Sequence, residues 1–219
     1  MGNSKSGGSK PPAGSSRTGY WEWEFSGPAP NHRYLVPAVV SCLPKPPQRL
    51  IDLGCGNGAL SSKLQTAGMI VTGIEGTESG VDRARQAYPD VTFIQHELGT
   101  PLPDTLQGQF DVVVSAEVIE HLFFPRELFA RAREALGSSG MLLVTTPFHG
   151  YWKNLALSIS GKMDAHHQAT SDYGHIKFFS ERTLGELAEK CGFRPIRFVR
   201  AGRIRPLEST MVLVAELLP

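Results

Sequence analysis

Short apolar runs alternate with longer amphipathic stretches through the middle of the chain. Apolar runs of strand length, bounded by turn residues, predict five strands, at 49–53, 70–74, 91–95, 110–115 and 140–147. The fourth run is apolar almost throughout, as in a strand that is covered on both faces. Helical stretches are expected at 31–43, 77–87 and 184–191. Strands that alternate with helices indicate a parallel sheet.

Two further segments follow the fifth predicted strand. Residues 194–199 and 210–217 read as a final pair of strands, whereas 148–179 has neither clean helical nor strand periodicity. This insertion holds Tyr151, Trp152, Lys153, His166, His167, Asp172, Tyr173, His175 and Lys177. It leaves the carboxyl edge of the predicted sheet, where open α/β sheets bind ligands. Long irregular segments at such places usually serve function, so we expect an acceptor-side lid.

The N-terminal part divides into a tail and a covering element. Residues 1–18 are Gly, Ser, Lys and Pro with almost no apolar side chains, which predicts disorder. The first six residues match the N-myristoylation pattern, which would permit peripheral membrane association; an unmodified tail is the preferred interpretation. Residues 19–47 begin with an aromatic cluster and are either a lid over a pocket, with His32 and Tyr34 as candidates, or plain packing.

Composition limits the class of protein. The chain has 219 residues and 41% hydrophobic residues, enough for one domain at 19–219 with a real core. A net charge of +1 disfavours a protein that binds nucleic acid through overall charge. Three cysteines without a C-x-x-C pair indicate a reducing, cytoplasmic environment. No apolar run is long enough for a membrane span, and the sequence carries no sign of the oligomeric state.

The first predicted strand ends in the glycine-rich turn DLGCGNG, residues 52–58. Glycines at 54 and 56 allow positive φ and close approach of a ligand to the backbone, and Gly58 lets the next helix pack tightly. The spacing also fits the dinucleotide-binding fingerprint of nicotinamide-dependent dehydrogenases. Two details disfavour that alternative. The carboxylate of Asp52 suits an amino group better than a pyrophosphate. Gly58 adds a third glycine, which gives a G-x-G-x-G spacing tighter than the G-x-G-x-x-G/A of the dinucleotide fingerprint.

An acid also follows the second predicted strand. Glu75 lies about twenty residues past the glycines, where an acid that binds a ribose belongs. Taken with the turn, these residues resemble the first motifs of class I S-adenosylmethionine (SAM)-dependent methyltransferases. The resemblance implies a Rossmann-like α/β fold with a seven-stranded, mostly parallel sheet, helices on both faces and an antiparallel last strand.

The same resemblance implies SAM as the cofactor and assigns residues to it. The amino-acid part of SAM would be held by Asp52, Gly54, Cys55, Gly56 and Gly58. Glu75 would hold the ribose and Glu97 would lie by the adenine, with His96 or Leu98 as alternatives at the latter position.

The run AEVIEHL at 116–122 carries the candidate chemistry. On a helix, Glu117, Glu120 and His121 would share one face. The run resembles ubiquinone-pathway O-methyltransferases and small-RNA 2′-O-methyltransferases; in the latter such residues bind a divalent metal and a downstream histidine, here His149, completes the set. Similar runs also occur in methyltransferases without a metal. We therefore assign no metal, place Glu117 at the cofactor, and name His121 and His149 as catalytic candidates.

These features together predict an enzyme that methylates a small organic acceptor, at a hydroxyl oxygen. An RNA 2′-O-methyltransferase and an inactive methyltransferase-like binding module are the alternatives. Methyl transfer needs donor, carbon and acceptor in line, and a group that takes the hydroxyl proton. Five arginines at 194, 197, 200, 203 and 205 are expected to lie on exposed strands rather than to form a docking patch. Phe123, Phe124, Phe129 and Leu136 are expected to serve packing.

Overall fold

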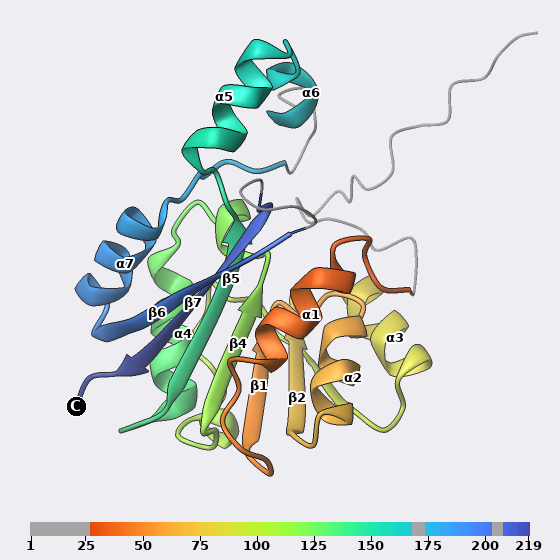
Figure 1. The fold of residues 1–219 in the computed structure, drawn as a ribbon. Helices are drawn as coiled ribbons and strands as arrows, with labels where there is room; N and C mark the ends of the chain where they lie inside the picture. Colours follow the sequence, from red (N-terminus) through yellow and green to blue (C-terminus); the bar gives the residue numbers. More distant parts are fainter. Residues whose placement is uncertain (1–26, 168–173, 203–207) are drawn as a thin grey trace, which may run out of the picture.

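The computed structural model describes residues 27–167, 174–202 and 208–219, and its centre is one twisted seven-stranded sheet (Figure 1). The strands are β1 (Arg49–Leu53), β2 (Ile70–Glu75), β3 (Thr92–Gln95), β4 (Val112–Ala116), β5 (Met141–Pro147), β6 (Phe193–Ala201) and β7 (Thr210–Leu217). Their order across the sheet is β3-β2-β1-β4-β5-β7-β6. All seven predicted strands are present; β1 and β7 have the predicted bounds, and the ends of the others differ by at most two residues.

The direction of the strands confirms the predicted fold class. β1 to β5 run parallel to one another, while β7 is antiparallel to both β5 and β6. β7 pairs with β5 over the whole length of the strand, from Thr210 opposite Pro147 to Glu216 opposite Met141. The strand order reverses between β1 and β4, which makes their carboxyl ends the topological switch point of the sheet.

Helices cover both faces of the sheet. On one face lie α1 (His32–Val40), α2 (Ala59–Thr66) and α3 (Glu78–Ala87); on the other lie α4 (Arg126–Leu136) and α7 (Glu181–Lys190). Successive side chains of β1 enter opposite cores: Leu50 packs with the first three helices, and Ile51 packs with α4 and α7. This two-sided burial explains why the central strands are apolar runs rather than alternating ones.

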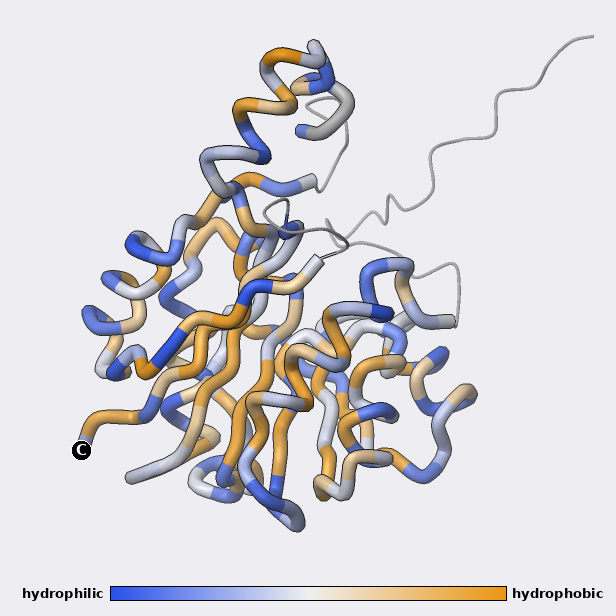
Figure 2. Tube along the Cα trace, viewed as in Figure 1, coloured by the Kyte–Doolittle hydropathy of each residue, from blue (hydrophilic) through white to orange (hydrophobic). Residues whose placement is uncertain are grey.

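The insertion after β5 differs from its prediction, because it contains two helices. These are α5 (Tyr151–Ile159) and α6 (Met163–His167), which stand apart from the sheet at its carboxyl edge (Figure 1). No residue of α5 is buried, and Figure 2 shows apolar positions along it. The short amphipathic run was too brief to be told from a loop by periodicity. Residues 168–173 and the side chain of His166 lie outside the described part.

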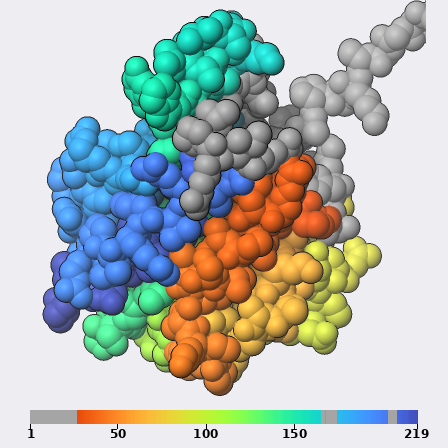
Figure 3. All heavy atoms as spheres, in the orientation of Figure 1, coloured from red at the N-terminus to blue at the C-terminus, as the bar shows by residue number. Residues whose placement is uncertain are grey.

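The N-terminal predictions are met only in part. The expected tail, the myristoylation pattern and the aromatic cluster fall within residues 1–26, outside the described residues. The helix predicted at 31–43 is α1, whose buried side chains include Leu35 and Val39. In the ribbon view α1 lies across one face of the sheet (Figure 1), and in the space-filling view the segment that contains it lies at the molecular surface (Figure 3). None of the described helices combines the length and apolar character that crossing a membrane requires.

The expectations for the cysteines, the arginines and the aromatic residues after β4 are also met only in part. All three cysteines are free. Arg194 and Arg200 pair with acids on neighbouring elements, at 2.6 Å and 2.7 Å, which agrees with exposed strands; Arg203 and Arg205 lie outside the described residues. Phe129 and Leu136 are core residues as expected. The expectation for Phe123 and Phe124 is wrong, because both side chains are exposed beside a cavity.

Candidate active site

A cavity of about 1270 Å³ opens at the switch point, beyond the carboxyl ends of β1, β2 and β4. Its lining comes from five regions: the segment before and within α1, the glycine turn with the start of α2, the ends of β2 and β3 with the residues that follow them, the residues from the end of β4 to the start of α4, and the segment at 174–176. The residues that resemblance assigned to the cofactor and that line it are Asp52, Gly54, Cys55, Glu75, Glu97 and Glu117. The cavity is large enough for a nucleoside-sized ligand.

The glycine turn has a backbone that only glycine adopts easily. Gly54, Gly56 and Gly58 have φ angles of 78°, 54° and 77°. The amides of Gly54 and Cys55 both donate to the carbonyl of Ile74, at 2.9 Å, which fastens the turn to the end of β2. A Cβ on Gly58 would lie 2.6 Å from the Phe93 ring, so this glycine allows α2 to approach β3 closely.

Asp52 is buried at the end of β1 and lines the cavity. Its Oδ2 accepts a hydrogen bond of 2.6 Å from the Ser61 hydroxyl of α2. Burial raises the pKa of Asp52 to about 7, although the Ser61 hydrogen bond opposes the shift. A cationic group bound in the cavity would favour the charged carboxylate, so the Asp52 environment is suited to an ammonium ligand.

The Glu75 carboxylate is held in one orientation at the end of β2. Its Oε2 accepts from the Gly56 amide at 3.1 Å, and its Oε1 accepts from the amide and hydroxyl of Thr77 at 3.0 Å and 2.8 Å. Oε1 accepts two hydrogen bonds and Oε2 only one, so Oε2 keeps a lone pair that can still receive a ligand hydroxyl. Glu97, Leu98 and Gly99 line the cavity beyond β3. His96, the other alternative there, instead contacts Thr100.

Glu117 follows β4 with a φ of 56°, the one non-glycine residue with positive φ among those described. Its Oε1 accepts from the hydroxyls of Thr145 on β5 and Thr210 on β7, at 2.8 Å and 2.7 Å. Burial raises the pKa of Glu117, and the two threonine hydrogen bonds oppose that shift. Strained backbone at such a position is typical of a functional site.

The helix expected at 116–122 is wrong. Glu117 precedes a single 3₁₀ turn, η2 (Ile119–His121), closed by a hydrogen bond from the His121 amide to the Val118 carbonyl. Without α-helical spacing the three polar side chains do not share a face. Glu117 and His121 line the cavity, whereas Glu120 is fully buried beneath it.

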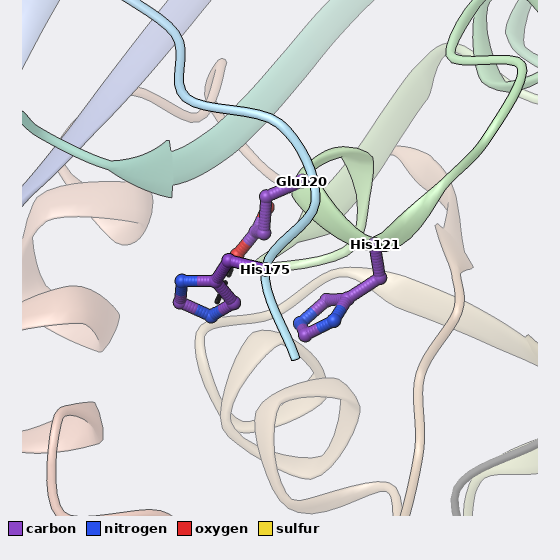
Figure 4. A group of neighbouring side chains, drawn as sticks. All are labelled: Glu120, His121 and His175. Carbon is purple, nitrogen blue, oxygen red and sulfur yellow. Dashed lines mark ion pairs between the residues drawn. The ribbon is translucent and has the colours of Figure 1, made fainter. Parts of the chain in front are cut away.

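Glu120 instead groups with two histidines (Figure 4). Its Oε1 lies 4.0 Å from Nε2 of His175, and one ligand atom each of Glu120, His121 and His175 fall within 4.8 Å of one another. Both Glu120 oxygens are buried without a hydrogen bond of good geometry. Burial raises the pKa of Glu120 well above its ordinary value, and the Glu117 charge adds to the shift.

His149 lies away from this group. Its ring stacks on His167 at 5.9 Å and meets Phe178 edge-on at 5.1 Å, and it is not among the residues that line the cavity. The catalytic assignment of His149 stays a prediction; the residue is half-buried and its ring contacts aromatic side chains. Gly56 and Gly58 also do not line the cavity; the first acts through Glu75, and the second through packing.

Several residues of the site were not expected from the sequence in these roles. Ser61, Thr77, Thr145 and Thr210 orient the carboxylates, and His175 replaces His149 beside Glu120 and His121. A weak signal existed for the threonines, which stand at strand ends on the carboxyl edge of the sheet. His175 reaches the site because the amides of Ile176 and Lys177 both donate to the Glu120 carbonyl at 3.0 Å.

Comparison with known proteins identifies the family. Residues 20–197 match the family model described as a methyltransferase domain. A ubiquinone biosynthesis O-methyltransferase of Cereibacter sphaeroides is 30% identical over 153 residues, which is 68% of this chain and 61% of the relative. A similar protein of Ruegeria pomeroyi is also 30% identical, over 68% of this chain and 60% of its own. The chain thus spans about three fifths of the length of these curated relatives.

Solved structures share the fold. Magnesium protoporphyrin IX methyltransferase from Synechocystis, with bound S-adenosylhomocysteine, has a TM-score of 0.63 at 20% identity, covering 84% of this chain and 82% of its own. A Haloferax volcanii putative methyltransferase, in complex with the Trm112 activator, has a TM-score of 0.68 at 15% identity, covering 86% and 90%. The solved structures share the sheet topology of this chain, and the match to the family model shows that the chain belongs to the methyltransferase domain family.

Proposed function

We propose that this enzyme transfers the methyl group of SAM to a hydroxyl oxygen of a small organic acceptor. The observation that carries the proposal is one continuous cavity that contains both the candidate cofactor carboxylates and the His121 imidazole. A methyl donor and a group that can receive the acceptor proton would therefore occupy the same space. The similarity to ubiquinone biosynthesis O-methyltransferases supports a hydroxyl acceptor.

In this proposal, the cofactor lies along the carboxyl ends of β1, β2 and β3. Asp52 and Glu117 face the cationic amino and sulfonium groups, because both are cavity carboxylates whose charged forms gain from a nearby cation. Glu75 accepts from a ribose hydroxyl with the lone pair of Oε2 that the Gly56 amide leaves free. Glu97 and Leu98 lie at the adenine.

His121 takes the proton of the acceptor hydroxyl. As the oxygen–carbon bond forms, the carbon–sulfur bond of the sulfonium breaks and its electron pair stays on sulfur, leaving neutral S-adenosylhomocysteine. The hydroxyl proton moves to a ring nitrogen of His121. In this proposal the acceptor lies at the exposed side of the cavity, beside Phe123 and Phe124. Positioning and proton transfer are the two contributions that the protein supplies.

A divalent metal ion is a second candidate for activating the hydroxyl. Glu120, His121 and His175 fit such an ion, because a fully buried carboxylate without a good hydrogen bond lies beside two imidazoles. These three residues would hold it, and the ion would polarise the acceptor oxygen and lower its pKa. His149 and Glu117 would not belong to the set.

An RNA acceptor is less well supported. The described lining of the cavity includes five acids, Asp52, Glu75, Glu97, Glu117 and Glu127, and within that lining no lysine or arginine. A phosphate backbone would be repelled by such a surface, and binding through phosphates needs basic side chains. The inactive binding module is disfavoured because all four carboxylates proposed to hold the cofactor line the cavity together with His121.

The direct test is transfer of a labelled methyl group from SAM to a panel of catechols, phenols and aliphatic alcohols, with an RNA oligonucleotide as a separate arm. The proposal expects a labelled methyl ether from at least one small acceptor and none from RNA. If the label were found only in the RNA, the result would contradict the proposal and support the RNA alternative. Bound SAM without transfer to any acceptor would favour the inactive module.

A further inference from the structure

Asn57, inside the glycine turn, is 4% exposed and joins two distant parts of the chain through the two ends of its amide. Its Oδ1 accepts from the Ala59 amide at 3.3 Å. Its Nδ2 donates to the Gly27 carbonyl at 2.9 Å, across thirty positions of sequence. A buried side-chain amide is costly unless both ends find partners, so these contacts define the role of the residue.

The acceptor end of the Asn57 amide belongs to α2. That helix begins at Ala59, and its N-cap residue is Gly58, which has no side chain to accept from the first amides. Asn57 Oδ1 provides this acceptor instead. The donor end has no part in the helix, and its partner lies on the segment that precedes α1.

That segment forms part of the cavity wall. Ala29, Asn31, His32 and Leu35 line the cavity, and so does Asn57. At one end of the segment Leu35 is 1% exposed and belongs to the core cluster that includes side chains of α2 and α3, so this end is fixed by burial. At the other end the Gly27 carbonyl accepts from Asn57. The segment is therefore fastened at both of its ends.

We propose that Asn57 latches the segment 27–35 over the cofactor cavity and slows the escape of the bound ligand. Opening the segment breaks the hydrogen bond to Gly27 and leaves a buried amide without that partner. The inference rests on the proposed function for the identity of the ligand, S-adenosylhomocysteine. Asn57 is in this sense a positioning residue, because it acts on the ligand through the segment that it holds.

The test is the dissociation rate of S-adenosylhomocysteine, measured by displacement in a stopped-flow instrument on the full chain. Asn57→Asp keeps the acceptor for the Ala59 amide and removes the donor to Gly27. Asn57→Ala removes both and adds no charge. We expect dissociation about tenfold faster in both variants, with association changed by less than about twofold, as for a lost buried hydrogen bond. Gln48→Glu is the matched control, because that amide donates to the Lys45 carbonyl away from the cavity.

Hydrogen exchange supplies a second readout. The amides of His32 and Leu35 donate to Ala29 and Asn31 within the segment, whereas the Ser62 amide donates to Gly58 in α2. In Asn57→Asp the first pair should exchange faster while Ser62 stays protected. An unchanged dissociation rate in Asn57→Asp, or equal loss of protection in α2, would overturn the latch. A wild-type protein that binds no S-adenosylhomocysteine would instead count against the proposed function itself.

Discussion

The amide of Gly56 and the carboxylate of Glu75 are joined by a hydrogen bond of 3.1 Å, although nineteen positions separate them. The glycine turn after β1 and the acid at the end of β2 are therefore one unit and not two independent ligand contacts. The orientation of the acid depends on the turn, and the shape of the turn depends on the acid. A change at either residue should reach both the ribose and the amino-acid ends of the cofactor.

The substitution Glu75→Gln tests this unit. The amide keeps the size of the side chain but cannot accept on both atoms from Gly56 and Thr77, and it loses the charge that strengthens hydrogen bonds to hydroxyls. We expect the Kd for S-adenosylhomocysteine to rise by about 10- to 100-fold, as for a lost charged hydrogen bond. Calorimetry measures it, with the exposed Glu78→Gln on α3 as control. Equal affinity in both variants would remove the ribose assignment.

The raised pKa of Asp52 predicts that both the stability of the protein and its affinity for the ligand depend on pH. Its folded pKa is raised to about 7, above the unfolded value, so the ligand-free protein should lose stability as pH rises from about 4 through 7. A ligand ammonium favours the ionised form, so affinity for S-adenosylhomocysteine should increase as pH rises toward 7, by up to about tenfold per unit. In the variant Asp52→Asn, the affinity measured by titration between about pH 5.5 and 8 should no longer depend on pH. If the affinity of this variant still changes with pH, the dependence comes from another group.

The two histidine candidates predict different kinetics. His121 lines the cavity and His149 does not, so His121→Ala should lower turnover by at least about 100-fold, the usual contribution of proton transfer. The same variant should change the Kd for S-adenosylhomocysteine by less than about threefold, because His121 serves the acceptor. His149→Ala is the comparison: a loss of the same size would support the catalytic prediction for His149, whereas retained turnover would remove it. Parallel loss of turnover and affinity in His121→Ala would show a structural role.

Gly58→Ala tests the packing of the turn. A Cβ there would lie 2.6 Å from Phe93 and 2.9 Å from Ala84, at a φ of 77°. We expect a loss of about 2–4 kcal/mol in the free energy of unfolding, from overpacking and backbone strain together. Gly161→Ala is a matched control, since its φ is 65° and nothing lies within 4 Å, so only the strain of about 1 kcal/mol applies. Urea unfolding distinguishes the two, and equal losses would refute the packing role.

Much of the fold was predictable because its signals are local. The apolar run of β4 and the turn at Gly54 carry their structure in a few adjacent residues. The conformation of the loop after β4 is not determined by its own adjacent residues. Spacing alone suggested a helix for Glu117 and Glu120, but hydrogen bonds from β5 and β7 to Glu117 set its conformation, and those strands come later in the chain. Tertiary contacts here override local pattern.

The histidine beside Glu120 shows the same limit. The resemblance to the small-RNA 2′-O-methyltransferases offered His149 for this role, whereas the structure brings in His175 through backbone hydrogen bonds of the next residues to Glu120. Which of several loop histidines reaches a site depends on the path of the loop, and no periodicity encodes that path. Polar residues at strand ends such as Thr210 were visible, but their partners were not.

The most direct test of the central claim is calorimetric titration of S-adenosylhomocysteine into protein purified without added metal, with and without EDTA. The account predicts one site with a Kd on the order of micromolar, and the same value in EDTA, because Glu120, His121 and His175 are not assigned to the cofactor. NAD should give no heat. Heat with NAD and none with S-adenosylhomocysteine would contradict the account, and affinity lost in EDTA would make the metal cluster part of the cofactor site.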